Sequence, residues 1–213
     1  MTARTNRGEA TRARILEAAQ TLVARRGVAG TSLDDIMAAS GTSKSQLYHY
    51  FADRDALMCA VVEAQASRVI GIQESCLSAV RSLGDLRTWR DGIVAASRER
   101  GGAGGCPIGS LASELAEQSE DARARLAESF RRWESCLAAS FETMRQSGTL
   151  DGQAEPAGLA TAVIAALQGG LLLAQTSRAT RPLELALDMA LDHVGRHAAG
   201  ADATRAGPAL QGG

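Results

Sequence analysis

The sequence predicts an all-α protein, and three observations support this fold class. The chain of 213 residues is 45% hydrophobic but only 3% aromatic, and alanine, leucine and arginine outnumber the β-branched residues, a balance that favours helix over sheet. Apolar residues recur three or four positions apart in several stretches. Glycine or proline separates these stretches and gives the helices their expected ends.

Composition also excludes several kinds of protein. Four cysteines without a Cys-x-x-Cys pair and only three histidines predict no metal site, and we expect no cofactor. No run comes close to the roughly 20 apolar residues that cross a bilayer, so no membrane partner is expected. The N-terminus lacks the apolar core of a secretory signal, which predicts a cytoplasmic protein.

The first helix is expected at Glu9–Arg26, where Ile15, Leu22 and Val23 share an apolar stripe. Residues 1–8 carry two arginines and allow two interpretations. They form either a disordered tail or an arm that reaches phosphates or a minor groove.

Two short helices then meet at Gly41. Ser32 with Asp35, and Ser43 with Gln46, each have the spacing of a capping box, which predicts one helix start at each serine. Glycine takes left-handed backbone angles at little cost, so Gly41 ends the first of the two helices. The pattern is that of a helix-turn-helix, although a corner in any all-helical protein would look similar.

The second short helix has two unlike faces. Leu47 and Phe51 lie four residues apart and are expected to anchor it to a core. Its other face is polar and carries Lys44, Ser45, Gln46 and His49. A helix of this size fits the major groove of DNA, where these side chains can exchange hydrogen bonds with base edges.

The run from Ser43 to Phe51, followed by Asp53-Arg54-Asp55-Ala56-Leu57, resembles the DNA-binding domain of TetR-family transcriptional regulators. The resemblance implies a three-helix DNA-binding domain at residues 1–55. It also implies a homodimeric regulator, most often a repressor, that leaves double-stranded operator DNA when a small-molecule inducer binds. Thr42 and the pair Ser45-Gln46 differ from the residues usual in the family.

The same resemblance assigns DNA contacts. Base edges are expected to meet Lys44, Ser45 and Gln46, and phosphates to meet Thr31, Tyr48, His49, Tyr50 and Arg54. The chemistry agrees, because lysine can donate to guanine, glutamine can pair with adenine, and hydroxyls suit phosphate oxygens.

Residues 56–198 are expected to form a helical ligand-binding and dimerisation domain. A long connector helix is predicted from Asp53 to about Leu83. The predicted helices after it are Leu86–Arg98, a helix opened by Cys106-Pro107, Glu120–Ser147, Ala157–Arg178 and Pro182–His197. The Gly101–Gly105 loop lacks the Lys-Ser/Thr ending of a phosphate-binding loop. Residues 199–213 are rich in glycine and alanine and are expected to be disordered.

The inducer is expected in an apolar pocket. Its expected lining is Trp89, Cys106, Phe130, Trp133 and Phe141, although such aromatic residues also serve as plain core. Cys106 supports an alternative function, since a thiol at a helix N-terminus favours the reactive thiolate and would make the protein a redox- or electrophile-sensing repressor. The other interpretation of Cys106 is a small apolar residue at a buried corner.

The last two helices are too apolar for this chain to cover alone, which predicts a two-fold dimer through a four-helix bundle. The expected interface residues are Val163, Leu167, Gly170, Ala174 and Leu187. No Ser/His/Asp set or metal-ligand spacing supports an enzyme. A helical enzyme and a structural dimer without a DNA role are the distant alternatives.

Overall fold

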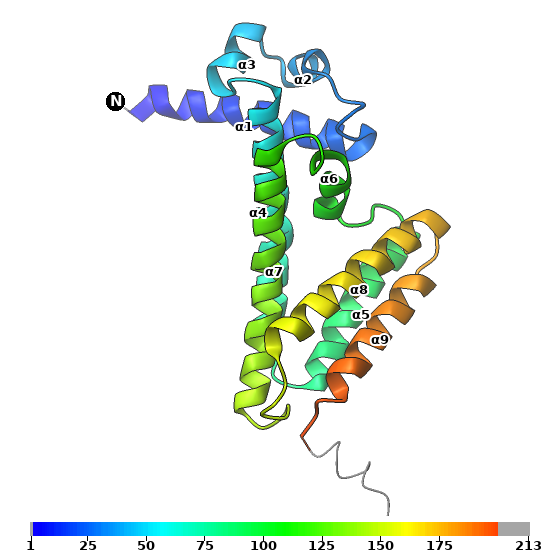
Figure 1. Ribbon diagram of the computed structural model, residues 1–213. Coiled ribbons are helices and arrows are strands. Elements are labelled where there is room, and N and C mark those ends of the chain that lie inside the picture. The colour runs from blue at the N-terminus through cyan, green and yellow to red at the C-terminus, as the bar shows by residue number, and fades with distance from the viewer. Residues whose placement is uncertain (1, 200–213) are drawn as a thin grey trace, which may run out of the picture. The chain divides into compact units, whose positions relative to one another are not determined.

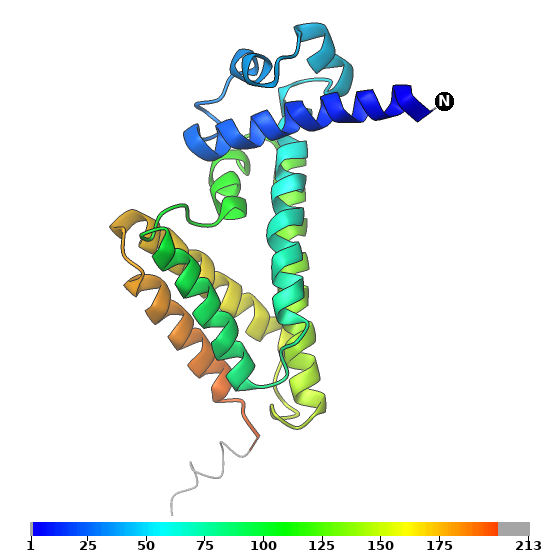
Figure 2. The ribbon, with the colours of Figure 1, turned by 180° about the vertical axis from the view of Figure 1, so that it is seen from behind.

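The computed structural model describes residues 2–199, and this part of the chain consists of helices joined by loops, without a strand (Figures 1 and 2). The helices are α1 (Thr2–Arg26), α2 (Leu33–Ser40), α3 (Lys44–Tyr50), α4 (Arg54–Leu77), α5 (Leu83–Glu99), α6 (Pro107–Leu115), α7 (Glu120–Gln146), α8 (Pro156–Ser177) and α9 (Arg181–Gly195). The all-α prediction is confirmed. The expected disordered tail lies outside the described residues, apart from Ala199.

The chain divides into two compact units. The first consists of the residues up to Gly71 together with Pro107–Phe130, and the second of Ile72–Cys106 together with the chain from Arg131 onward. The expected boundary lay between residues 55 and 56, whereas the first unit continues to Gly71, because helix α4 runs unbroken from Arg54 to Leu77. The division also assigns α6, which sequence reasoning put with the ligand domain, to the unit that contains α1–α3.

The core of the first unit is built by α1, α2, α3 and the start of α4. Ile15, Ile36, Leu47 and Leu57 are fully buried there. The apolar stripe expected on α1 and the anchor expected on α3 therefore both face the core. Helix α1 begins at Thr2, so the backbone of residues 2–8 is helical, which disagrees with the disordered tail, one of the two interpretations of this segment.

In the second unit, α8 and α9 form a hairpin, with α5 packed against α9 (Figures 1 and 2). The two hairpin helices approach closely at Gly170, where an added Cβ would lie 3.0 Å from the Cα of Leu183. Burial between the two helices corrects the expected dimer interface. The residues assigned to it, Val163, Leu167, Gly170, Ala174 and Leu187, are all buried within one chain.

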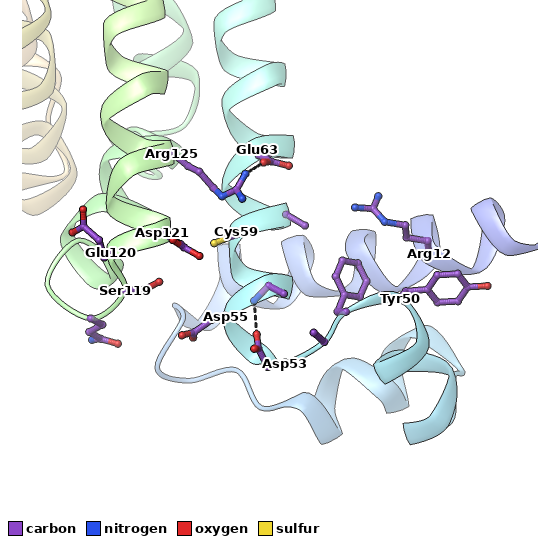
Figure 3. A pocket seen from close by; sticks show the side chains of 15 residues that line it. Arg12, Tyr50, Asp53, Asp55, Cys59, Glu63, Ser119, Glu120, Asp121 and Arg125 are labelled. Carbon is purple, nitrogen blue, oxygen red and sulfur yellow. Dashed lines mark hydrogen bonds and ion pairs between the residues drawn. The ribbon is translucent and has the colours of Figure 1, made fainter.

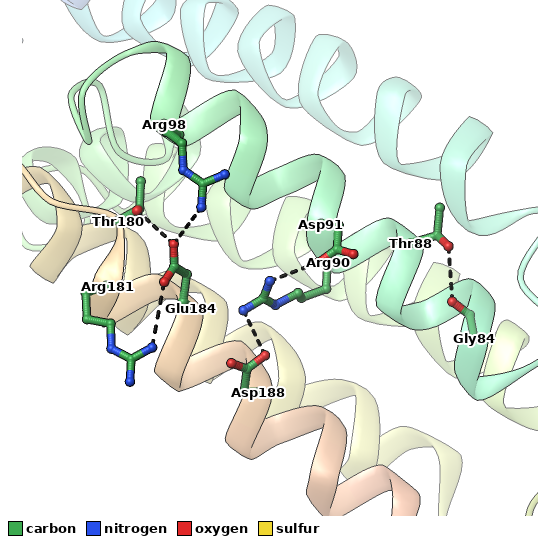
Figure 4. A network of polar contacts seen from close by, with 9 residues as sticks. All are labelled: Gly84, Thr88, Arg90, Asp91, Arg98, Thr180, Arg181, Glu184 and Asp188. Atoms are coloured by element: carbon green, nitrogen blue, oxygen red, sulfur yellow. Dashed lines mark hydrogen bonds and ion pairs between the residues drawn. The ribbon is translucent and has the colours of Figure 1, made fainter.

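A polar network joins α5 to α9 (Figure 4). Glu184 accepts hydrogen bonds from Thr180 and Arg98, both at 2.9 Å, and Arg90 pairs with Asp188 at 2.8 Å. The Thr180 hydroxyl, followed by the Arg98 guanidinium, lowers the pKa of Glu184, so this carboxylate stays charged. These contacts cover one side of α9, and α8 covers another.

The connection between α4 and α5 also differs from expectation. Helix α4 ends at Leu77 and α5 already begins at Leu83, whereas the sequence was expected to break at residues 83–85. The reason is a cap at Ser82, whose Oγ accepts from the Asp85 amide at 3.1 Å. The Asp85 carboxylate in turn accepts from the Arg81 amide at 2.9 Å, which stabilises the helix start despite Gly84.

Helix α8 corrects another expectation. By length and composition alone, this one helix among the described residues could cross a membrane. Thr161, Gln168 and Gln175 interrupt the apolar residues of this segment without adding charge, so it contains no unbroken apolar run of that length. Core helices of proteins without a membrane pass the same test, and eight residues of α8 are buried in the structure.

Candidate nucleic-acid interface and ligand sites

The first helix of the turn motif is closed at both ends by local hydrogen bonds. The Ser32 hydroxyl accepts from the Asp35 amide at 3.1 Å, and the Asp35 carboxylate accepts from the Ser32 amide at 3.2 Å. The Ser32 hydroxyl also donates to the Asp35 carboxylate at 2.6 Å, and this bond, followed by the bond from the Ser32 amide, lowers the pKa of Asp35. Gly41 ends the helix in the left-handed conformation at φ 62°, as predicted.

Helix α3 starts with the second capping box, which is also confirmed. The Ser43 hydroxyl accepts from the Gln46 amide at 3.3 Å, and Gln46 Oε1 accepts from the Ser43 amide at 2.9 Å. The box stabilises a helix of only seven residues. It also engages the side-chain oxygen of a residue expected to read bases, while Gln46 Nε2 remains free to donate.

One face of α3 is polar and exposed to solvent. Leu47 is buried beneath it, whereas Lys44, Ser45, Gln46, Tyr48 and His49 are all exposed. Tyr48 is the only aromatic side chain among the exposed large hydrophobic residues of the described chain, at 44% exposure. The structure therefore brings five of the eight predicted DNA-contact residues together on one accessible helix face.

Thr42, the position that departs from the family pattern, is buried just before α3. Its hydroxyl lies 2.7 Å from the hydroxyl of Ser40. The two hydroxyls satisfy each other, so a polar residue occupies this buried position at little cost. The departure is a structural substitution and lies off the exposed face.

Thr31, Arg54 and Tyr50 have different surroundings from the other predicted contacts. Thr31 is 3% exposed and its hydroxyl donates to the Gly27 carbonyl at 2.8 Å, so the group expected at a phosphate is bound within the chain in this structure. Arg54 is half-buried and donates to the Val28 carbonyl at 2.8 Å. Tyr50 is half-buried with its ring edge against His49.

A polar pocket of about 610 Å³ lies in the same unit (Figure 3). It is lined from α1, from the link between α3 and α4, from the first turns of α4, and from the start of α7 with the residues just before it. Arg125 forms an ion pair with Glu63 across it, and Arg12 stacks on the ring of Phe51 at 5.2 Å. Although carboxylates gather here, the described residues contain no group of three His, Cys, Asp or Glu placed to hold a metal.

An apolar groove of about 500 Å³ lies in the second unit, between the end of α4 and α5. Trp89 lines it and donates from Nε1 to Gln73 at 2.9 Å. The groove was located only in part from the sequence. Its other lining residues include Ile72, Cys76, Val80, Thr88 and Ile93, and none of these was assigned to a pocket from the sequence.

The other four residues expected to line a pocket do not line this groove. Phe141 is fully buried, Trp133 is 3% exposed, and Phe130 belongs to the first unit. Trp133 nevertheless has an unusual feature, because its Nε1 is buried without a hydrogen-bond partner. Buried donors are normally paired, so Trp133 remains of interest for a ligand that carries an acceptor.

Cys106 lies directly before Pro107, the first residue of α6, which is the predicted cap position. It is 7% exposed, which matches a small residue at a buried corner better than an accessible thiol. Cys76 is the exposed cysteine and lines the apolar groove. Burial raises the pKa of Cys59 and of Cys136, which disfavours their thiolates.

Comparisons with protein families agree with this geometry. Residues 15–61 match the family of bacterial regulatory proteins called the tetR family, and residues 83–189 match the C-terminal domain of LmrA/YxaF-like transcriptional regulators. The chain belongs to the TetR family. It is therefore a ligand-responsive, DNA-binding transcriptional regulator and not an enzyme.

Individual relatives extend over most of the chain. An uncharacterized HTH-type transcriptional regulator from Lactococcus lactis is 31% identical over 184 residues, which covers 84% of this chain and 90% of the relative. The transcriptional repressor NemR of Escherichia coli K12 is 28% identical over 184 residues and covers 83% of this chain and 90% of NemR. A TetR regulator from Chloroflexus aurantiacus superposes with a TM-score of 0.78 at 25% identity, over 91% of this chain and 98% of the other.

Proposed function

We propose that this TetR-family regulator is a cytoplasmic repressor that reads its operator with α3. The observation that carries the proposal is the capped α3, which presents Lys44, Ser45 and Gln46 beside Tyr48 and His49 on one exposed face. Lysine and glutamine suit base edges, and the Tyr48 hydroxyl suits a phosphate oxygen. The name of NemR, a transcriptional repressor, supports repression as the direction of control.

We further propose that the repressor is a homodimer through the exposed side of the α8–α9 hairpin. Leu172 and Leu173 on α8, and Leu185 and Met189 on α9, are each at least 50% exposed. The other sides of α9 are already covered by α8 and by the ion pairs to α5. Exposed large apolar side chains on two neighbouring helices suit an isologous contact with a second copy of the chain.

The inducer is proposed to be a small, largely apolar molecule that binds the second unit. Two features favour this unit, namely the groove beside Trp89 and the unpartnered Nε1 of Trp133. Ile93→Trp would fill the groove, and Trp133→Phe would remove the buried donor and leave a smaller aromatic ring in its place. Native mass spectrometry of co-purifying molecules would identify the inducer. The variant that no longer responds to this inducer then locates the binding site.

A salt-dependent gel shift with the DNA upstream of the protein's own gene tests the proposed function. The wild-type chain should shift this DNA in preference to random DNA of equal length, with an affinity that falls steeply as salt rises. The variant Lys44→Ala/Gln46→Ala should lose the preference for this DNA, while its helix content and its oligomeric state stay those of the wild-type chain. Equal binding to both DNAs by the wild-type chain would contradict an operator in that region.

A further inference from the structure

A carboxylate from α6 binds the link that joins α1 to α2. Glu114 Oε2 accepts a hydrogen bond from the Val28 amide at 2.7 Å and a second from the Ala29 amide at 3.2 Å. Both amides belong to the short segment between the supporting helix and the first helix of the turn motif. The acceptor is more than 80 residues away in the sequence, so both hydrogen bonds depend on the fold.

The same segment is held from its opposite side. Arg54 at the start of α4 donates to the Val28 carbonyl at 2.8 Å. Val28 is itself 1% exposed, so its side chain is packed while its amide and its carbonyl are each bound by a charged side chain. Hydrogen bonds to charged groups are about twice as strong as neutral ones, which makes this a firm attachment.

Gly27 makes the approach of Glu114 possible. Its φ is +75°, and a Cβ at this position would lie 3.0 Å from Glu114 Oε2 and 3.1 Å from Oε1. Any other L-residue would be strained by the backbone conformation and would also crowd the carboxylate. The chain thus keeps its backbone bare at the point where the carboxylate of α6 binds.

We infer that Glu114 is a positioning residue for DNA reading. By binding the Val28 and Ala29 amides it fixes where α2 begins relative to α1, and α3 follows α2 after only three residues. Loss of the carboxylate would loosen the link and lower the fraction of molecules whose reading helix is correctly placed. Glu114 itself touches no DNA in this proposal, which rests on the proposed function of α3.

The test compares Glu114→Ala with Glu117→Ala, a control that removes the same charge from an exposed position just after α6. In Glu114→Ala, amide exchange at Val28 and Ala29 should be about tenfold faster, because a charge-assisted hydrogen bond is lost. Operator affinity should fall by about fivefold to tenfold. The salt slope should stay unchanged, because no phosphate contact is removed. Glu117→Ala should match the wild-type protein in all three measurements.

Two further variants make the result decisive. Glu114→Gln keeps an acceptor oxygen and should show an intermediate exchange rate, and it carries the test if Glu114→Ala does not fold. Arg54→Ala should also weaken operator binding, and its combination with Glu114→Ala should be less than additive because both act on one peptide segment. Wild-type exchange at Val28 and Ala29 in both Glu114 variants, or operator affinity equal to that of Glu117→Ala, overturns the inference. Failure of the wild-type chain to bind any operator would instead contradict the proposed function.

Discussion

The turn motif at α2–α3 and the α8–α9 hairpin obtain their structure in different ways. Both short helices of the motif begin with a reciprocal capping box, and α3 is held to the core largely through Leu47. Helix α9 lacks a side-chain cap, since the Thr180 hydroxyl bonds the Glu184 carboxylate instead. The hairpin is held by apolar burial along its whole length, with ion pairs on one side.

This difference has a functional consequence. Local hydrogen bonds let α3 leave its outer face polar and exposed, as the proposed contact with DNA requires. The α8–α9 hairpin has apolar residues on the side that is buried within the chain and also on the side that is exposed to solvent. Composition alone therefore does not distinguish its buried side from its exposed side. Substitutions in the hairpin should therefore separate folding from assembly, and substitutions in the motif should separate helix capping from DNA reading.

The largest effect is expected between α8 and α9. Leu187→Ala removes a fully buried side chain and should lower the free energy of unfolding by about 2–5 kcal/mol. Gly170→Arg should misfold or aggregate, since even a Cβ meets Leu183. Chemical denaturation measures the first effect, and Asp192→Ala, at an exposed position of α9, should change stability by less than about 0.5 kcal/mol.

The open side of the hairpin should respond differently. The double variant Leu173→Arg/Met189→Arg should give folded monomers, because these side chains are 58% and 67% exposed and lose only their contacts with the second copy. Light scattering after size exclusion, together with circular dichroism, checks this outcome. Gln153→Arg, in an exposed loop, is the control and should remain dimeric. A charged pair that leaves the dimer intact would place the interface elsewhere.

Gln46 tests capping against reading within the motif. Gln46→Ala should weaken the α3 cap and relax base preference at one position per half-site, by about 1–3 kcal/mol. Gln46→Glu keeps an acceptor for the Ser43 amide but loses the donor Nε2, so α3 should stay capped while the preference for adenine disappears. Binding to randomised operator libraries measures preference. Unchanged preference in both variants would remove Gln46 from the reading set.

Tyr48→Phe should have a smaller and more uniform effect. Loss of one neutral hydrogen bond to phosphate should weaken binding to all DNA sequences by about 0.5–1.5 kcal/mol. Since the hydroxyl carries no charge, the dependence of log affinity on log salt should not change, whereas Lys44→Ala should reduce that slope if its ammonium lies at a phosphate. Titrations at several salt concentrations distinguish the two variants. A sequence-dependent loss in Tyr48→Phe would indicate base contact instead.

The four cysteines should also differ in thiol reactivity, with no expected change in folding. Alkylation near pH 8 should modify exposed Cys76 first. Because burial raises the pKa of Cys59 and Cys136, their thiolate fractions, and hence their rates, should keep rising with pH beyond the usual thiol range. Mass spectrometry of peptides follows each site. Fastest reaction at Cys106, with loss of DNA binding on oxidation that Cys106→Ser prevents, would favour the thiol-sensing alternative.

The sequence by itself determined the helix class, the turn motif and its family. Each depends on interactions within a few residues. Ser32 bonds with Asp35, Ser43 bonds with Gln46, and Gly41 adopts the left-handed conformation that ends α2. The exposed face of α3 follows from the same short-range logic, because Leu47 and Phe51 define its buried side.

Tertiary structure decided what depends on partners distant in the chain. Helical spacing placed Leu167 and Leu187 on apolar sides of their helices. Only the packing of α8 against α9 shows that these two side chains are buried within the chain, whereas Leu173 and Met189 are exposed to solvent. The roles of Thr31, Arg54 and Glu114 at the α1–α2 link likewise depend on which backbone groups their side chains reach, and for Arg54 and Glu114 those groups are 26 and more than 80 residues away. Periodicity reports which side of a helix is apolar, whereas the identity of the group that covers it is set by the fold.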